Sequence, residues 1–104
     1  MAWLILFFAG LLEICWAVGL KYTDGFTRPL PTVLTLIAMA CSVGLLGLAV
    51  RELPVGTAYA VWSGLGAVGT VIAGIMLFGE SMALIKLVSV ALIVIGLLGL
   101  KLAS

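Results

Sequence analysis

Four long apolar segments, separated by short polar stretches, constrain this sequence more than any other feature. They cover about residues 2–20, 30–50, 55–78 and 82–101. A helix needs roughly 20 residues to cross a hydrocarbon layer about 30 Å thick, so four crossings use about 80 residues. Because 65% of the 104 residues are hydrophobic and only 9% are charged, a water-soluble domain is excluded. The segments lack the alternation of barrel strands, so the sequence predicts a single domain (1–104), all-α, of four transmembrane helices.

Turn-forming residues mark the ends of these segments. The stretch Lys21-Tyr22-Thr23-Asp24-Gly25 predicts a loop after the first helix. Pro29 suits the first turn of the second helix, and Pro54 precedes the third. Gly79 predicts the end of the third helix, and Ser81 is a candidate N-cap for the fourth. The connections are therefore short, and neighbouring helices are expected to be antiparallel.

The two cysteines, Cys15 and Cys41, both lie inside apolar segments, and the sequence contains no histidine. Both are interpreted as small packing residues, so we expect no disulfide, no metal site and no cofactor. Neither a nucleic-acid partner nor enzymatic activity is expected, since no nucleophile is paired with a base.

Positive charge is nearly balanced between the two ends of the predicted helices. Lys21, Arg28 and Lys86 fall on one side of the membrane, and Arg51 and Lys101 fall on the other. Because positive charge sets orientation, a tally of three against two gives little preference. A chain that inserts both ways can pair with an inverted copy of itself, and four helices are few to enclose a pathway. Both points favour an antiparallel, dual-topology homodimer.

Glu13 is the only ionisable residue well inside a predicted span. An acid at that depth costs roughly 2.5 to 3.5 kcal/mol on insertion scales, so it requires an explanation. A structural explanation is a protonated acid hydrogen-bonded to a neighbouring helix. A functional explanation is a cation or proton site, in which protons and the cation compete for one carboxyl group. The functional explanation is the stronger hypothesis.

Aromatic, hydroxyl and small residues recur on the faces that could surround this acid. At about 100° per residue, Gly10 and Trp16 lie within about 60° of Glu13 on the first helix. Trp3, by contrast, is expected to be an interfacial anchor. The remaining candidates form a stripe of small and hydroxylated residues on the second helix and a stripe of aromatics and glycines on the third: Thr35, Ala38, Ser42, Ala49, Tyr59, Trp62, Ser63, Gly66 and Gly69.

The string Gly64-Leu65-Gly66-Ala67-Val68-Gly69 matches a dinucleotide-binding pattern, but it lies within an apolar helix and follows no strand. We therefore interpret Gly64, Gly66 and Gly69 as sites of close packing or bending. Gly96 and Gly99, on the fourth helix, are predicted dimer contacts. Lys101 is interpreted as a charge at the membrane interface, with closure of the helix end or a salt bridge as alternatives.

A buried carboxylate flanked by indoles and hydroxyls suits a flat monovalent cation. The carboxylate can accept two parallel N–H bonds, and aromatic rings attract delocalised positive charge. Ser42, Tyr59 and Trp62 are predicted to hold the carboxylate in position from a second layer. Guanidinium has the required shape, but composition and spacing equally permit a bulky quaternary ammonium ion.

These residues identify a resemblance that covers essentially the whole chain. The sequence resembles the small multidrug resistance family, and most closely its guanidinium exporter branch. The motifs that carry the resemblance are Gly10 to Ala17, Leu20-Lys21-Tyr22, Gly25 to Arg28, Leu53 to Ala67 and the terminal Gly99-Leu100-Lys101. Ser63 departs mildly, since Thr is also common there in this branch.

The resemblance implies an antiparallel homodimer in a bacterial inner membrane that exports guanidinium ions in exchange for protons. It implies that Glu13 is the shared proton and substrate site, that Gly10 is the small residue beside it, and that Trp16, Ser42, Tyr59 and Trp62 line or support it. Two alternatives remain: a broad exporter of quaternary ammonium ions and other drugs, and a membrane subunit that only carries protons.

Overall fold

The computed structural model describes residues 1–103, which form four α-helices and no strands. They are α1 (Ala2–Tyr22), α2 (Pro29–Ala49), α3 (Val55–Phe78) and α4 (Leu84–Leu102). Each is long and apolar enough to cross a membrane, by length and composition. The all-α, four-span fold predicted from the apolar segments is therefore confirmed.

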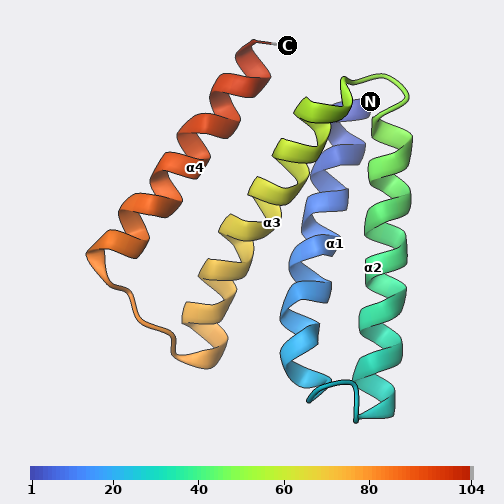
Figure 1. Ribbon diagram of the computed structural model, residues 1–104, viewed down its shortest axis with the longest axis vertical. Helices are drawn as coiled ribbons and strands as arrows, with labels where there is room; N and C mark the ends of the chain where they lie inside the picture. The colour runs from blue at the N-terminus through green and yellow to red at the C-terminus, as the bar shows by residue number, and fades with distance from the viewer. Residues whose placement is uncertain (104) are drawn as a thin grey trace.

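The helices form a thin slab, with principal extents of 41 × 34 × 16 Å between Cα atoms (Figure 1). α1 packs against both α2 and α3, whereas the backbone of α4 lies close to that of α3 alone. The shortest of these extents is less than half of either of the others. The single chain is therefore flat, with α4 at one edge (Figure 1).

The loop between α1 and α2 reverses the chain through left-handed backbone conformations. Asp24, Gly25 and Phe26 have φ values of 49°, 70° and 66°. The hydroxyl of Thr23 donates to the carbonyl oxygen of Leu20 at 2.8 Å and accepts from the N–H of Phe26 at 3.3 Å. This confirms the loop predicted at Thr23, Asp24 and Gly25, whereas Lys21 and Tyr22, also predicted to lie in the loop, are the last residues of α1. The turn makes α1 and α2 a close antiparallel pair.

Proline and glycine set the neighbouring helix ends as predicted. Pro29 is the first residue of α2, where its missing N–H leaves no helical bond unmade. Gly79 ends α3 with a φ of 64°, and the N–H of Glu80 then bonds the carbonyl oxygen of Gly74 at 3.3 Å. A left-handed glycine is a common helix terminator because it has no Cβ to clash.

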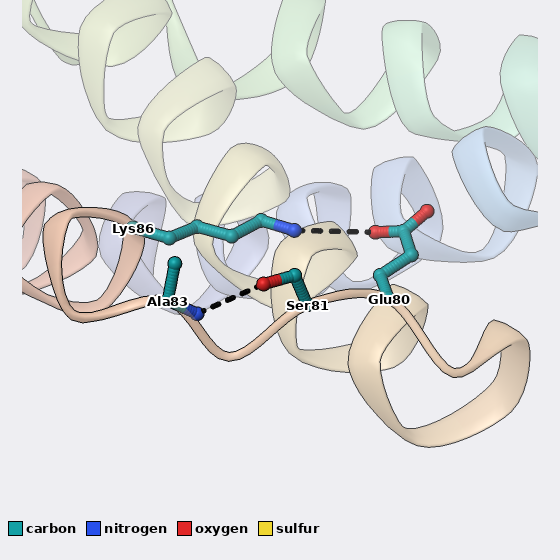
Figure 2. A network of polar contacts seen from close by, with 4 residues as sticks. All are labelled: Glu80, Ser81, Ala83 and Lys86. Atoms are coloured by element: carbon teal, nitrogen blue, oxygen red, sulfur yellow. Dashed lines mark hydrogen bonds and ion pairs between the residues drawn. The ribbon is translucent and has the colours of Figure 1, made fainter.

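The predicted start of the fourth helix was wrong by two residues. Ser81 is not its N-cap, because α4 begins at Leu84 after an N-cap at Ala83. The Ser81 hydroxyl instead accepts from the N–H of Ala83 at 3.2 Å, in a local turn before the helix (Figure 2). The Nζ of Lys86 lies 3.8 Å from Oε1 of Glu80 across this turn.

Small residues allow the first three helices to approach closely. The buried core consists of Leu6 and Ala9 on α1, Ala49 on α2, and Ala58 and Trp62 on α3. Buried residues on α2 are Thr35, Ser42 and Ala49, so the small and hydroxylated stripe predicted on this helix does face its neighbours. By contrast, α4 contributes no buried residue at all within its described length.

Candidate functional site

Glu13 lies midway along α1 with its carboxyl group against α3. A Cβ placed on Gly66 would collide with Oε1 of Glu13, so the glycine leaves the space that the carboxyl group occupies. Oε1 is buried and has no hydrogen-bond partner among the described residues. An unpaired buried acceptor is unfavourable in a folded protein, and such groups call for an explanation.

A chain of two hydrogen bonds joins three helices close to this acid. The indole Nε1 of Trp62 on α3 donates to Oγ of Ser42 on α2 at 2.9 Å. The Ser42 hydroxyl in turn donates to the carbonyl oxygen of Ala9 on α1 at 2.6 Å. Both bonds are buried, and Trp62 is only 8% exposed. One hydroxyl therefore ties α2 and α3 to the helix that carries Glu13.

Tyr59 lies one turn before Trp62 on α3. The two ring centroids are 5.6 Å apart with a tilt of 52° between the planes. Tyr59 is 57% exposed in the single chain, whereas Trp62 is buried. The hydroxyl of Ser63 bonds the carbonyl oxygen of Tyr59, within the same helix, and does not contact the acid. Tyr59 is thus open to a ligand or a second chain.

Trp16 lies nearly one turn after Glu13 on α1 and packs against the core. Its indole Nε1 is buried and has no hydrogen-bond partner in the described chain. An indole N–H can only donate, and an ionised carboxylate can only accept. One unpaired donor and one unpaired acceptor are therefore buried on neighbouring turns of α1.

The glycines singled out in the sequence fall into three groups, according to what an added Cβ would contact. A Cβ at Gly10 would collide with the side chain of Leu65, and one at Gly69 with the side chain of Ile14, so both lie in the α1–α3 contact. A Cβ at Gly64 would come within 2.8 Å of the Leu97 side chain, between α3 and α4. Gly96 and Gly99 on α4 have nothing within 4 Å of an added Cβ.

A cavity of about 400 Å³ lies between α1 and α3 on the side of the acid that faces the α3–α4 connection. Its walls include Ala17, one turn from Glu13, and Thr70, one turn from Gly66. Glu80 and Lys21 line its far end. Open space therefore begins one helical turn from the carboxyl group.

The structure groups Glu13, Gly66, Trp16, Ser42 and Trp62 on the three packed helices, and leaves Gly96 and Gly99 apart on α4. The predicted support of Glu13 by Ser42 and Trp62 is not made by direct hydrogen bonds within the described chain. Trp62 bonds Ser42, Ser42 bonds a backbone carbonyl, and neither bonds Glu13.

Two residues of this region were not predicted from the sequence. The carbonyl of Ala9 was missed because a side-chain pattern carries no signal for a backbone acceptor. Leu65, which covers Gly10, was missed because it looks like any other apolar residue.

The sequence profile of the family described as Small Multidrug Resistance protein matches residues 1–93. The chain belongs to the small multidrug resistance family. This membership confirms the resemblance inferred from the sequence motifs, and it agrees with the four-span architecture. It also places the chain as a multi-pass protein of the bacterial inner membrane.

Several relatives in this family are similar along their full length. The chain is 62% identical over 104 residues to a guanidinium exporter of Proteus vulgaris, with all of both chains covered. It is 61% identical to a guanidinium exporter of Yersinia pestis, again over all of both chains. It is 57% identical to a guanidinium exporter of Salmonella typhimurium, with 100% of this chain and 99% of the relative covered.

Proposed function

We propose that this protein is a proton-coupled antiporter that exports guanidinium and small guanidinyl cations, with Glu13 as the shared binding site. The observation that carries the proposal is the buried, unpaired Oε1 of Glu13, which lies in a space kept free by Gly66. The names of the full-length relatives support guanidinium as the substrate.

The working unit in this proposal is an antiparallel homodimer. Support comes from the flat shape of a single chain, which leaves Tyr59 exposed and leaves α4 with no fully buried residue. A second, inverted copy would close the open side, bring a second Glu13 towards the first, and supply partners for the unpaired groups. The nearly balanced positive charge is compatible with insertion in both orientations.

Recognition follows from the hydrogen-bonding capacity of the groups that are present. Guanidinium is a planar cation with N–H donors in a fork that matches a carboxylate. The face of Trp62 or Tyr59 can attract its delocalised charge. The Trp62–Ser42–Ala9 bonds keep the indole ring in one orientation, so the ligand meets a preformed surface.

Coupling follows from exclusive occupancy of Glu13. A proton and a cation cannot neutralise the same carboxylate together, so binding of one releases the other. If an empty, ionised site is too unfavourable in lipid to reorient, the dimer switches between opening to one side of the membrane and opening to the other only when a proton or a cation is bound. Apparent guanidinium affinity is then expected to weaken as pH falls, by up to about ten-fold per pH unit for one competing proton.

The test is Glu13→Gln in proteoliposomes with a pH gradient, measured as guanidinium currents on a solid-supported membrane. Glu13→Gln is expected to remove coupled transport, and Glu52→Gln, a matched change at an exposed loop acid, is expected to keep it. Persistent pH-driven guanidinium transport by Glu13→Gln would refute the proposal. The same currents with tetra-alkylammonium ions distinguish a broad exporter: stronger responses to these ions than to guanidinium would favour that function.

A further inference from the structure

An apolar groove is lined by α1, α3 and α4 at the end of the molecule that carries the amino terminus. Its volume is about 370 Å³. Figure 1 shows α4 at the edge of the slab, beside α3 and away from α2. The walls are apolar except for one ammonium group: Trp3, Phe7, Val61, Leu65, Val68, Val94, Leu97, Leu98 and Lys101.

The groove has the depth of part of one lipid leaflet. On α3 its walls run from Val61 to Val68, and on α4 from Lys101 back to Val94. Each stretch is about 10 Å long at a rise of 1.5 Å per residue, against roughly 15 Å for half of the hydrocarbon core. An acyl chain lying in the groove would therefore have its headgroup at the level of Lys101 and Trp3.

One positively charged side chain, Lys101, lies at this outer end of the groove. The Nζ of Lys101 lies over the ring of Trp3, 4.6 Å from its centroid. Within residues 1–103 no carboxylate forms an ion pair with Lys101. Trp3 belongs to the first turn of α1, where no side chain caps the helix N-terminus. Unpaired N–H groups at a helix start attract phosphate, and so does the ammonium group.

We propose that this groove binds one anionic phospholipid, with an acyl chain between α4 and the α1–α3 pair and its phosphate at Lys101. Charge complementarity favours this occupant: the ring of Trp3 fixes the ammonium group and leaves its N–H bonds for an acceptor. The site is separate from Glu13, and the inference does not depend on the transported substrate.

A second copy of the chain is the competing occupant. In an antiparallel pair the second chain is inverted, so its α3–α4 connection lies on the same side of the membrane as Lys101 of the first chain. An acidic side chain from that connection could then pair with the ammonium group. That arrangement would fill the groove with protein side chains and make lipid charge irrelevant. The identity of the lipid headgroup therefore separates the two occupants.

The test measures binding of phosphatidylglycerol and phosphatidylcholine to the purified full chain by native mass spectrometry, together with thermal stability in detergent. Phosphatidylglycerol is expected to bind more tightly and to raise the melting temperature. Lys101→Gln is expected to weaken that binding about five-fold, the effect of one lysine at an anionic surface. Arg51→Gln removes a charge from an exposed loop on the same side of the membrane but outside the groove. This variant is expected to bind phosphatidylglycerol as tightly as the unchanged protein.

Two further arms decide the assignment. Leu98→Trp fills the groove without changing charge, and it is expected to weaken phosphatidylglycerol binding as well. Inorganic phosphate alone is expected to give no comparable stabilisation, because it has no acyl chain. Equal binding of the two lipids, full binding by Lys101→Gln, or an equal effect of inorganic phosphate would each overturn the proposal. Guanidinium-dependent stabilisation retained in Lys101→Gln shows that the variant is folded, whatever the outcome for lipid.

Discussion

The bundle of α1, α2 and α3 and the separate helix α4 are equally apolar in sequence, yet they are stabilised in different ways. The bundle has a buried core in which three alanines pack with Leu6 and Trp62, and a hydrogen-bond chain joins all three helices. α4 has no buried residue, and its serine, Ser89, bonds only its own helix at the carbonyl of Ile85. Hydropathy therefore shows which segments enter a membrane, while buried polar contacts and small residues show which are packed within the chain.

The largest expected effect on stability is at Ser42. Ser42→Ala removes the acceptor of the Trp62 indole and the donor to the Ala9 carbonyl, leaving both buried groups unpaired. The free energy of unfolding is expected to fall by about 1–3 kcal/mol. Unfolding in mixed detergent with increasing sodium dodecyl sulfate measures it. Ser89→Ala is the matched control on α4 and is expected to change it by less than about 0.5 kcal/mol. Equal losses of stability in Ser42→Ala and Ser89→Ala would contradict the view that buried hydrogen bonds stabilise the three-helix bundle but not α4.

Gly66→Ala tests the packing of the acid itself. The added methyl group would occupy the position of the Glu13 carboxyl group, which is at the free end of a flexible side chain. The helix is therefore expected to remain folded while the carboxyl group shifts, with apparent guanidinium affinity reduced by at least about ten-fold, or about 1.4 kcal/mol. Gly47→Ala on α2, where an added Cβ meets nothing within 4 Å, is the control. Wild-type affinity in Gly66→Ala would show that the carboxyl group does not need this space.

Gly99→Leu tests whether α4 is completed by a second chain. An added Cβ at Gly99 meets nothing within 4 Å among residues 1–103, so the fold of the single chain is expected to be unchanged. If α4 forms part of the proposed homodimer, a bulky residue on its glycine face should weaken association by about 1 kcal/mol. Single-molecule dimerisation measurements in liposomes would detect this. An unchanged dimer fraction would show that the dimer interface lies on a surface other than the glycine face of α4.

The smallest effect is expected at the α3–α4 connection. Lys86→Gln removes the contact with Glu80, in which the charged atoms are 3.8 Å apart and both side chains are substantially exposed. Such a pair is screened by water, so the change in the free energy of unfolding should be only a few tenths of a kcal/mol. A loss above about 1 kcal/mol in the same detergent titration would mean that this connection fixes the position of α4.

The fold could be predicted because the membrane imposes it: apolar length gives the helices, and Pro29 and Gly79 give two of their ends. Glu13 was identifiable for the same reason, as an acid where acids are rare. The partners of Ser42 could not be predicted, because they depend on how closely α1, α2 and α3 approach. The start of α4 was misplaced because Ser81 makes a local turn. A serine before an apolar segment fits such a turn as well as it fits a helix N-cap, so the sequence alone does not distinguish the two.

The direction of the bonds at Ser42 has a consequence for proton transfer. The hydroxyl gives its hydrogen to the Ala9 carbonyl and receives one from an indole, which can donate but cannot accept. A sequence of bonds that starts at an indole and ends at an amide carbonyl offers no group that exchanges protons near neutral pH. It therefore cannot serve as a proton wire, and in the proposed antiport mechanism protons would have to reach Glu13 by a route that does not pass through Ser42.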